Sequence, residues 1–275
     1  EIASCLVGSE MCIRDRLWAS SYLQAAAQEY KLWYDEPAQV WTEALPLGNG
    51  RLGAMVFGNP GVEHIQLNEE TIWAGRPNNN ANPNALEYIP KVRQLVFEGK
   101  YLEAQTLATE KIMAKTNSGM PYQSFGDLHI SFPGHTRYSD YYRELSLDSA
   151  RTIVRYKVDG VTYQRETLTS FADQVVMVRL TASQPGKITC NANLTTPHQD
   201  VMVSTEGEEV TLSGVSSWHE GLKGKVEFQG RMTARSQGGT QACRDGVLSI
   251  EGADEAVIYL SLIHISEPTR QEAIS

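Results

Sequence analysis

The sequence predicts a mainly β protein: a large antiparallel β-sandwich, or super-sandwich, that carries a short two-helix insert. From residue 126 onward, apolar and polar residues alternate with a period of two in short runs separated by turn residues, as in the strands of a sandwich. Over residues 84–114 the apolar residues instead recur at helical spacing. The chain shows no internal repeat and no linker rich in proline or serine, so we expect one domain.

The helical insert is predicted over residues 84–114. A glycine just after the last periodic residue is typical of a helix C-terminus, and Gly99 holds that position here. We therefore predict two antiparallel helices joined at Gly99-Lys100. Their apolar positions are Leu86, Ile89, Val92, Val96, Leu102, Leu107 and Ile112.

The β region begins with a predicted strand at 128–132 and contains a predicted hairpin. Runs 152–158 and 161–169 flank Asp159-Gly160, a dipeptide that suits a two-residue turn because both central positions need positive φ. Further short strands are predicted at 175–181, 186–194, 201–205, 210–213, 225–228, 231–235, 247–250 and 256–260.

Two motifs precede the insert: LPLGNGRLGAMVFG at 45–58 and QLNEETIWAGRP at 66–77. The first has four glycines, which allow the backbone to turn sharply and to be approached closely. Together with segments 142–148, 163–167 and 170–175, these motifs resemble the N-terminal domain of glycoside hydrolase family 95, the α-L-fucosidase family. The resemblance covers about residues 30–260 and implies a β-sandwich that precedes a catalytic barrel.

Both ends of the chain are predicted to be artificial. One short DNA sequence, read on its two opposite strands, encodes both residues 6–15 and residues 261–270, as a sequencing adapter would. We therefore assign residues 1–16 and 261–275 to an adapter-derived artefact and exclude them from the natural domain, 28–260. Residues 17–27, an apolar stretch that closes on Ala25 and Ala27, fit the remnant of a signal peptide, with a short amphipathic helix as the alternative. This predicts a protein exported by a bacterium to the periplasm, the cell surface or the medium.

Composition excludes several classes of partner. The formal net charge of −9 argues against nucleic acid and anionic membranes, and no stretch reaches the roughly 18 apolar residues that span a bilayer. We expect no cofactor, because Gly48-Asn49-Gly50 lacks the Lys-Ser/Thr of a phosphate loop. We also expect no metal, since the histidines show no usual ligand spacing. For Cys190 and Cys243, a single bridge and two unpaired thiols both remain open.

The resemblance implies a parent enzyme that acts as an inverting exo-α-L-fucosidase on the terminal fucose of glycans. Inversion requires a carboxylic acid and a carboxylate base on opposite sides of the scissile bond. The resemblance implies that these groups lie on an (α/α)6 barrel beyond this chain, which the sandwich would dock against, so we assign no catalytic residue. The alternatives are a non-catalytic carbohydrate-binding or structural β-sandwich module, and a parent that acts as an α-L-galactosidase, because the two sugars differ only at C6.

Six residues of the two motifs are candidates for contact with substrate or with the barrel. An aromatic face with amide or charged groups beside it can stack on and hydrogen-bond a pyranose, whereas an alternative for Trp73 is packing in the sandwich or against the barrel. Glu69 and Glu70 are expected to point apart and to serve in capping or a solvated turn. Tyr138, Tyr141 and Tyr142 are expected to form a structural aromatic cluster. The six candidates are Asn49, Arg51, Asn68, Glu69, Trp73 and Arg76.

Overall fold

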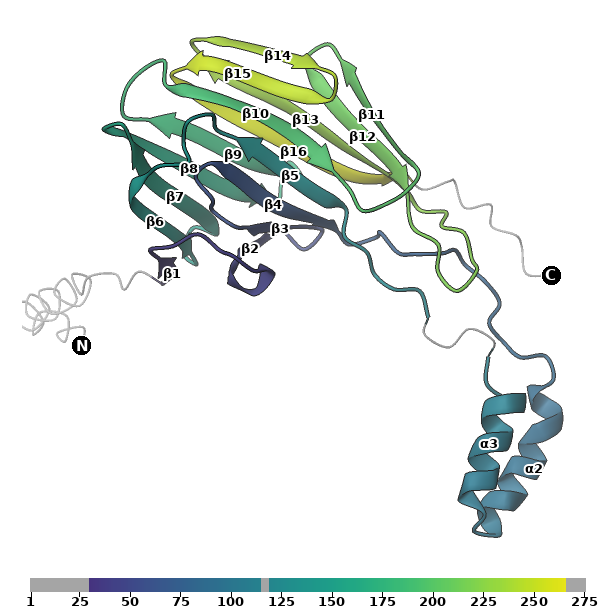
Figure 1. The fold of residues 1–275 in the computed structure, drawn as a ribbon. Helices are drawn as coiled ribbons and strands as arrows, with labels where there is room; N and C mark the ends of the chain where they lie inside the picture. Colours follow the sequence, from purple (N-terminus) through teal and green to yellow (C-terminus); the bar gives the residue numbers. More distant parts are fainter. Residues whose placement is uncertain (1–29, 115–118, 266–275) are drawn as a thin grey trace, which may run out of the picture.

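The computed structural model describes residues 30–114 and 119–265. Two antiparallel sheets face each other as a sandwich, and a pair of helices projects from one end of it (Figure 1). The predicted fold class, a mainly β sandwich with a two-helix insert, is confirmed. The residues predicted as an N-terminal adapter and a signal-peptide remnant lie outside the described residues.

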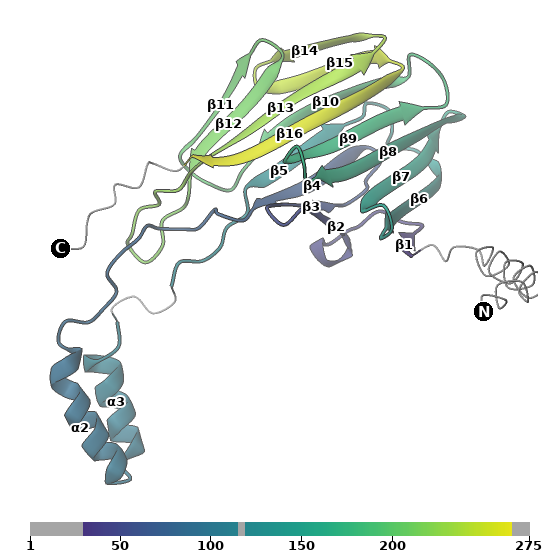
Figure 2. The same cartoon turned by 180° about the vertical axis from the view of Figure 1, so that it is seen from behind.

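One sheet has nine strands within the described part, in the order β1-β6-β7-β8-β9-β16-β13-β12-β11 (Figure 2). A 3₁₀ turn, η1 (Trp41–Glu43), follows its first strand. The strands are β1 (Lys31–Tyr34), β6 (Ser139–Ser146), β7 (Arg151–Val158), β8 (Val161–Ser170), β9 (Val175–Ala182), β11 (Val201–Glu206), β12 (Glu209–Val215), β13 (Glu227–Gln237) and β16 (Glu255–Ile265).

The other sheet has seven described strands in the order β14-β15-β10-β5-β4-β3-β2. Inward-facing residues of both sheets alternate with outward-facing ones and together form a single apolar core. The strands are β2 (Leu45–Gly48), β3 (Leu52–Val56), β4 (Val62–Glu69), β5 (Gly126–Ser131), β10 (Ile188–Thr195), β14 (Thr240–Arg244) and β15 (Val247–Ala253).

The predicted hairpin is confirmed between β7 and β8. Asp159 and Gly160 have φ values of 47° and 79°, as a two-residue turn with positive φ at both central positions requires. The turn sets the register of the pair, in which Tyr156 lies opposite Tyr163. Local turn chemistry was therefore sufficient to predict this element.

The prediction of two strands at 225–228 and 231–235 was wrong: a single strand, β13, runs through both. Gly230, which lies between the two predicted ranges, is inside the strand. A side chain there would collide with the Phe125 ring, which packs edge-on against Phe228 with centroids 5.4 Å apart. Gly230 thus provides room for a core aromatic ring rather than a turn. Strand β14 at the sheet edge was not predicted.

Strand β16 continues past Leu260, where we expected the natural domain to end. Its pairing with β13 extends to Glu227 opposite Ile265, and Leu262 is fully buried in the core. Residues 261–265 therefore belong to the folded sheet. Their origin in an adapter stays a prediction.

The insert leaves the sandwich between β4 and β5 and consists of α2 (Ala85–Phe97) and α3 (Tyr101–Lys111), as predicted. Gly99, with φ of 75°, ends α2, and the Lys100 amide donates to the Leu95 carbonyl at 2.9 Å. Within the described residues, Ala104 is the one buried side chain of the two helices. Apolar side chains consequently remain uncovered, among them Leu86, Phe97, Tyr101 and Leu102. No described helix has the length and apolarity needed to cross a membrane.

Both cysteines of the predicted domain are free. Cys190 is buried, and burial raises the pKa of its thiol to about 12. The tyrosine cluster is only partly as predicted. Tyr138 and Tyr141 lie together, with ring centroids 5.7 Å apart, whereas Tyr142 packs against Trp33 instead, because neighbours on a strand point to opposite faces.

Candidate functional site

The two sequence motifs meet at the end of the sandwich from which the insert leaves, called here the insert end. It contains the turn between β2 and β3, the end of β4 and the segment that follows it. Asn49 holds the turn: its Oδ1 accepts hydrogen bonds from the amides of Arg51 and Leu52 at 3.1 and 2.7 Å. Its Nδ2 donates to the carbonyl of Ser170, at the end of β8 in the other sheet, at 2.7 Å. Asn49 therefore ties the two sheets together.

Arg51 and Glu69 form an ion pair across the strands that the turn connects. Arg51 Nε lies 3.1 Å from Glu69 Oε1, and the Glu69 side chain is completely buried while Arg51 is one-third exposed. The other carboxylate oxygen of Glu69 accepts from the Thr71 amide at 2.9 Å and from the Thr71 hydroxyl. Glu70 is exposed, so the two glutamates point apart as predicted. Glu69 is not in a solvated turn, however, because the Arg51 pair holds it inside.

Asn68 lies on the outer face of the same strand end. Its carboxamide oxygen is buried and has no hydrogen-bond partner within the described residues. Gly53, which has no side chain, lies directly opposite it on the neighbouring strand β3.

Trp73 and Arg76 line a separate feature, an open cavity of about 480 Å³ called here the Trp73 cavity. The Trp73 side chain is 45% exposed, its Nε1 donates to the Glu70 carbonyl at 3.2 Å, and its ring meets Tyr122 edge-on at 5.4 Å. Tyr122 in turn donates to the Glu69 carbonyl at 3.1 Å, which links this cavity to the buried ion pair. The other lining residues are mostly apolar or amide-bearing: Ala74, Gly75, Pro77, Asn78, Asn80, Gly119, Met120 and Val226.

The six predicted residues thus fall into two groups. Asn49, Arg51, Asn68 and Glu69 belong to the strands and turn of the insert end, whereas Trp73 and Arg76 line an open cavity.

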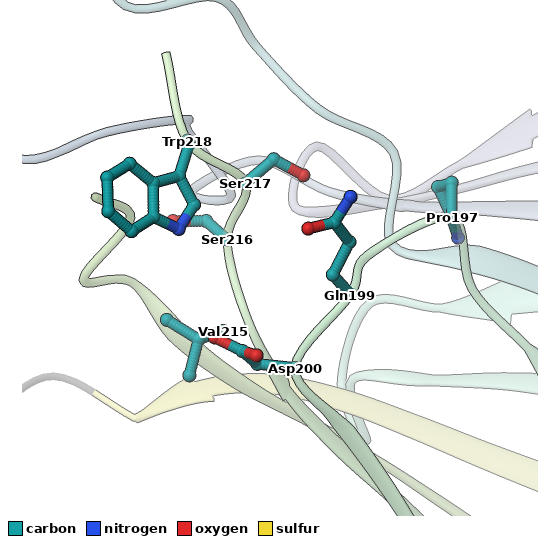
Figure 3. Close-up of a pocket in the computed structure, with 7 residues that line it drawn as sticks. All are labelled: Pro197, Gln199, Asp200, Val215, Ser216, Ser217 and Trp218. Atoms are coloured by element: carbon teal, nitrogen blue, oxygen red, sulfur yellow. The ribbon is translucent and has the colours of Figure 1, made fainter. Parts of the chain in front are cut away.

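A second cavity, of about 290 Å³, was not predicted (Figure 3). It is lined by the exposed Trp218 together with Gln199, Asp200 and Ser217, and Figure 3 shows Trp218 and Pro197 on opposite sides of it. The Gly75 amide donates to the Ser217 carbonyl at 2.9 Å, so backbone contact joins this cavity to the segment that lines the first. Its residues come from the two segments on either side of the β11–β12 hairpin, 197–200 and 215–218, and no single motif identifies them.

The buried carboxylates in the described part of the chain are Glu63 and Glu69. Glu63 lies 3.3 Å from Arg165 Nη1 and accepts from the amides of Gly58 and His64 at 2.7 and 3.1 Å. Both carboxylates are therefore occupied by a cation and by nearby donors. Acid–base cleavage of a glycosidic bond needs one carboxyl group that can donate its proton and another that can activate water, and neither glutamate is arranged for this.

Comparison with known proteins gives a consistent family assignment. Residues 32–263 match the model of the glycosyl hydrolase family 65 N-terminal domain. The chain is 32% identical over 264 residues to alpha-L-fucosidase 2 of Arabidopsis thaliana. This alignment covers 86% of this chain and 30% of that protein. It is 28% identical over 170 residues to a probable alpha-fucosidase A of Aspergillus oryzae, covering 58% of this chain and 23% of that protein.

The chain thus spans less than a third of the length of these curated relatives. Among solved structures, a putative kojibiose phosphorylase from the human microbiome aligns with 86% of this chain and 32% of its own, at 11% identity and a TM-score of 0.47. The match over residues 32–263 decides the family: the chain belongs to the glycosyl hydrolase family 65 N-terminal domain family.

Proposed function

We propose that this chain is the N-terminal sandwich domain of an exported bacterial enzyme of the glycoside hydrolase family 95 type, which removes terminal L-fucose from glycans with inversion. The observation that carries the proposal is the 32% identity to an α-L-fucosidase along 86% of this chain but only 30% of that relative. In this proposal the bond-breaking carboxyl groups lie on a helical barrel outside the chain. Glu63 and Glu69 are each paired with an arginine, which supports placing the catalytic carboxyl groups outside this chain.

The uncovered insert supports docking to such a barrel. Leu86, Phe97, Tyr101 and Leu102 of α2 and α3 are each more than two-thirds exposed. Several large apolar side chains exposed on one short insert are typical of an interface. We assign the insert, together with the scaffold built by Asn49, Arg51, Asn68 and Glu69, to the interdomain contact.

Trp73 and Arg76 are the residues that we assign to carbohydrate contact. An exposed indole can stack on the apolar face of a pyranose, while a guanidinium beside it donates to hydroxyl groups. The same cavity supports the second candidate function, a non-catalytic carbohydrate-binding module. No residue of the described part favours an α-L-galactosidase over a fucosidase.

Two assays separate the candidates. The chain alone and the longer protein encoded by the source DNA are each incubated with an aryl α-L-fucoside. We expect hydrolysis with inversion only from the longer protein. Turnover by the chain alone would overturn the placement of the catalytic groups, and a reading frame that stops before any barrel would favour the binding module.

The carbohydrate contact is tested in the longer protein with Trp73→Ala. Loss of one stacking contact is expected to raise KM by about 2- to 10-fold. Trp41→Ala, which removes a similarly exposed tryptophan on η1, is the matched control and should leave KM unchanged. Equal effects of the two variants would remove Trp73 from the site.

A further inference from the structure

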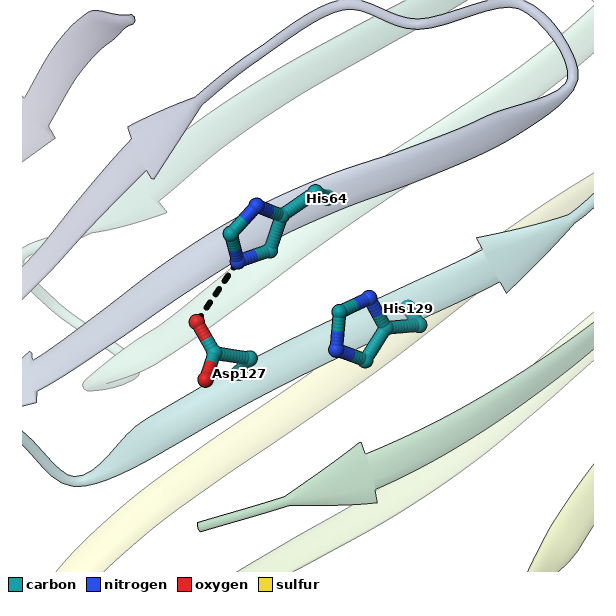
Figure 4. Close-up of side chains that lie close together, drawn as sticks. All are labelled: His64, Asp127 and His129. Atoms are coloured by element: carbon teal, nitrogen blue, oxygen red, sulfur yellow. Dashed lines mark hydrogen bonds and ion pairs between the residues drawn. The ribbon is translucent and has the colours of Figure 1, made fainter. Parts of the chain in front are cut away.

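Three potential metal ligands lie together on the outer face of the seven-stranded sheet (Figure 4). His64 is on β4, and Asp127 and His129 are on β5. His64 lies directly opposite His129 in the register of the two strands, and Asp127 is two residues before His129, so all three side chains share one face. Their ligand atoms all lie within 4.8 Å of one another.

The cluster is held in place by its neighbours. His64 Nε2 lies 2.6 Å from Asp127 Oδ1. The His64 ring packs between Phe57, with centroids 4.3 Å apart, and His129, with centroids 5.0 Å apart. The side chains of His64 and Asp127 keep 32% and 24% of their exposure. The ligands are thus oriented by packing and still reachable from solvent.

The charges around the cluster do not oppose a cation. Across the strands, Gln66 lies opposite Asp127 on one side and Thr195 on the other, and Asn193 lies opposite His129. None of these neighbours is a lysine or an arginine. Among these cross-strand neighbours, therefore, no charged side chain repels a bound cation.

We propose that His64, Asp127 and His129 form a binding site for a divalent first-row transition metal, with Zn²⁺ as its most suitable ion. Two imidazole nitrogens and one carboxylate oxygen are typical ligands of zinc, and a fourth position is left open to water. Bonds of about 2.0–2.2 Å place tetrahedral ligands roughly 3.3–3.5 Å apart. The His64–Asp127 contact, now 2.6 Å, must therefore lengthen, and the widest separation, at most 4.8 Å, must shorten by up to about 1.5 Å. Side-chain rotation can supply both changes. Ca²⁺ and Mg²⁺ prefer six or more oxygen ligands, which this site does not offer.

The test is titration of the full chain, freed of metal by a chelator, with Zn²⁺ in a calorimeter. We expect binding at one site, with Mg²⁺ and Ca²⁺ giving no comparable heat. His129→Asn and Asp127→Asn each remove a ligand and should weaken Zn²⁺ binding by at least about 10-fold. His219→Gln, which removes a histidine from a different part of the fold, is the matched control and should bind like the unaltered chain.

Thermal unfolding gives a second readout that does not depend on heat of binding. Zn²⁺ should raise the Tm of the unaltered chain and of His219→Gln, but not that of His129→Asn. Circular dichroism of the metal-free variants establishes that each is folded. The proposal is overturned if Zn²⁺ does not bind, or if His129→Asn binds it as tightly as His219→Gln does, which would leave the cluster as a hydrogen-bonded His–Asp pair with a stacked neighbour.

Discussion

Glu63 and His64 are neighbours on β4, yet they occupy opposite sides of the seven-stranded sheet. Glu63 points inward, is 1% exposed and is paired with Arg165 at 3.3 Å. His64 points outward, is one-third exposed and is paired with Asp127 at 2.6 Å. Successive side chains of a strand alternate between faces, so one residue step separates a pair in the core from a pair at the surface.

The inner pair is built into the core by several contacts. The Arg165 guanidinium lies over the rings of Phe132 and Tyr156, at 4.7 and 5.1 Å, and its Nη2 donates to the Asn59 carbonyl at 2.8 Å. Removal from water disfavours charge, and burial raises the pKa of the Glu63 carboxyl above its usual 4.5, with Arg165 offsetting part of this effect. The outer pair is partly exposed to water, which screens its attraction. The difference indicates that the inner pair is fixed by the fold, whereas the outer pair is available for binding.

The largest expected effect comes from breaking the inner pair. Arg165→Met leaves Glu63 without its cation in a dry environment, and we expect a loss of about 3–5 kcal/mol in the free energy of unfolding at neutral pH, measured by urea denaturation. The double variant Glu63→Leu with Arg165→Met should be more stable than Arg165→Met alone, because no buried charge remains.

Arg179→Met is the control for this experiment. Arg179 is paired with Glu255 at 2.7 Å at the surface of the same sandwich, and its loss should cost about 1 kcal/mol or less. If the Arg165→Met and Arg179→Met variants are equally stable, the buried pair contributes no more to stability than the surface pair.

A smaller effect is expected in the pH dependence of stability. Because the folded-state pKa of Glu63 is raised, the folded protein retains a proton that the unfolded chain has already released at pH 4.5 and slightly above. The contribution of Glu63 is therefore fully present below about pH 4.5 and is lost as the pH rises through the folded-state pKa. Its slope is at most about 1.4 kcal/mol per pH unit for one proton. Glu63→Gln should remove this decline from the free energy of unfolding measured across the acid range.

Glu255→Gln provides a control of opposite sign. The hydrogen bond from Arg179 lowers the pKa of Glu255, so its stabilising contribution is present above about pH 4.5 and is lost as the pH falls. A Glu63→Gln variant with the same pH profile as the unaltered chain would show that Glu63 has the same pKa in both states.

The comparison also shows which parts of the molecule the sequence could predict. The Asp159-Gly160 turn and the Gly99 helix end depend on residues adjacent in the chain, and both were predicted. The continuous strand β13 was predicted as two strands, because Gly230 between them makes room for Phe125, a residue far away in the sequence. Composition cannot distinguish a glycine that turns the chain from one that makes room for a ring.

The candidate sites show the same limit. The motif around Asn49 predicted a turn, but its hydrogen bond to Ser170 depends on how the two sheets face each other. His64 and His129 have no recognisable ligand spacing because the helical insert separates them in the chain. Only the pairing of β4 with β5 places them opposite each other. The sequence did show that Asp127 and His129 are two residues apart, a spacing that puts both on one face of a strand. It could not show that His64 lies beside them on the neighbouring strand.

The smallest expected effect concerns the outer pair and completes the comparison. In the metal-free chain, Asp127→Asn removes a carboxylate that water already solvates in part, so the free energy of unfolding should change by about 1 kcal/mol or less. Repeating the urea denaturation with Zn²⁺ should widen the gap, because only the unaltered chain gains stability from ligand binding. A metal-free loss as large as that of Arg165→Met would mean that the outer pair, like the inner one, is needed to hold the sheet together. The proposal that the partly exposed pair is available to bind a metal would then lose its support. A metal that separated His64 from Asp127 would in that case also unfold the strands that carry them.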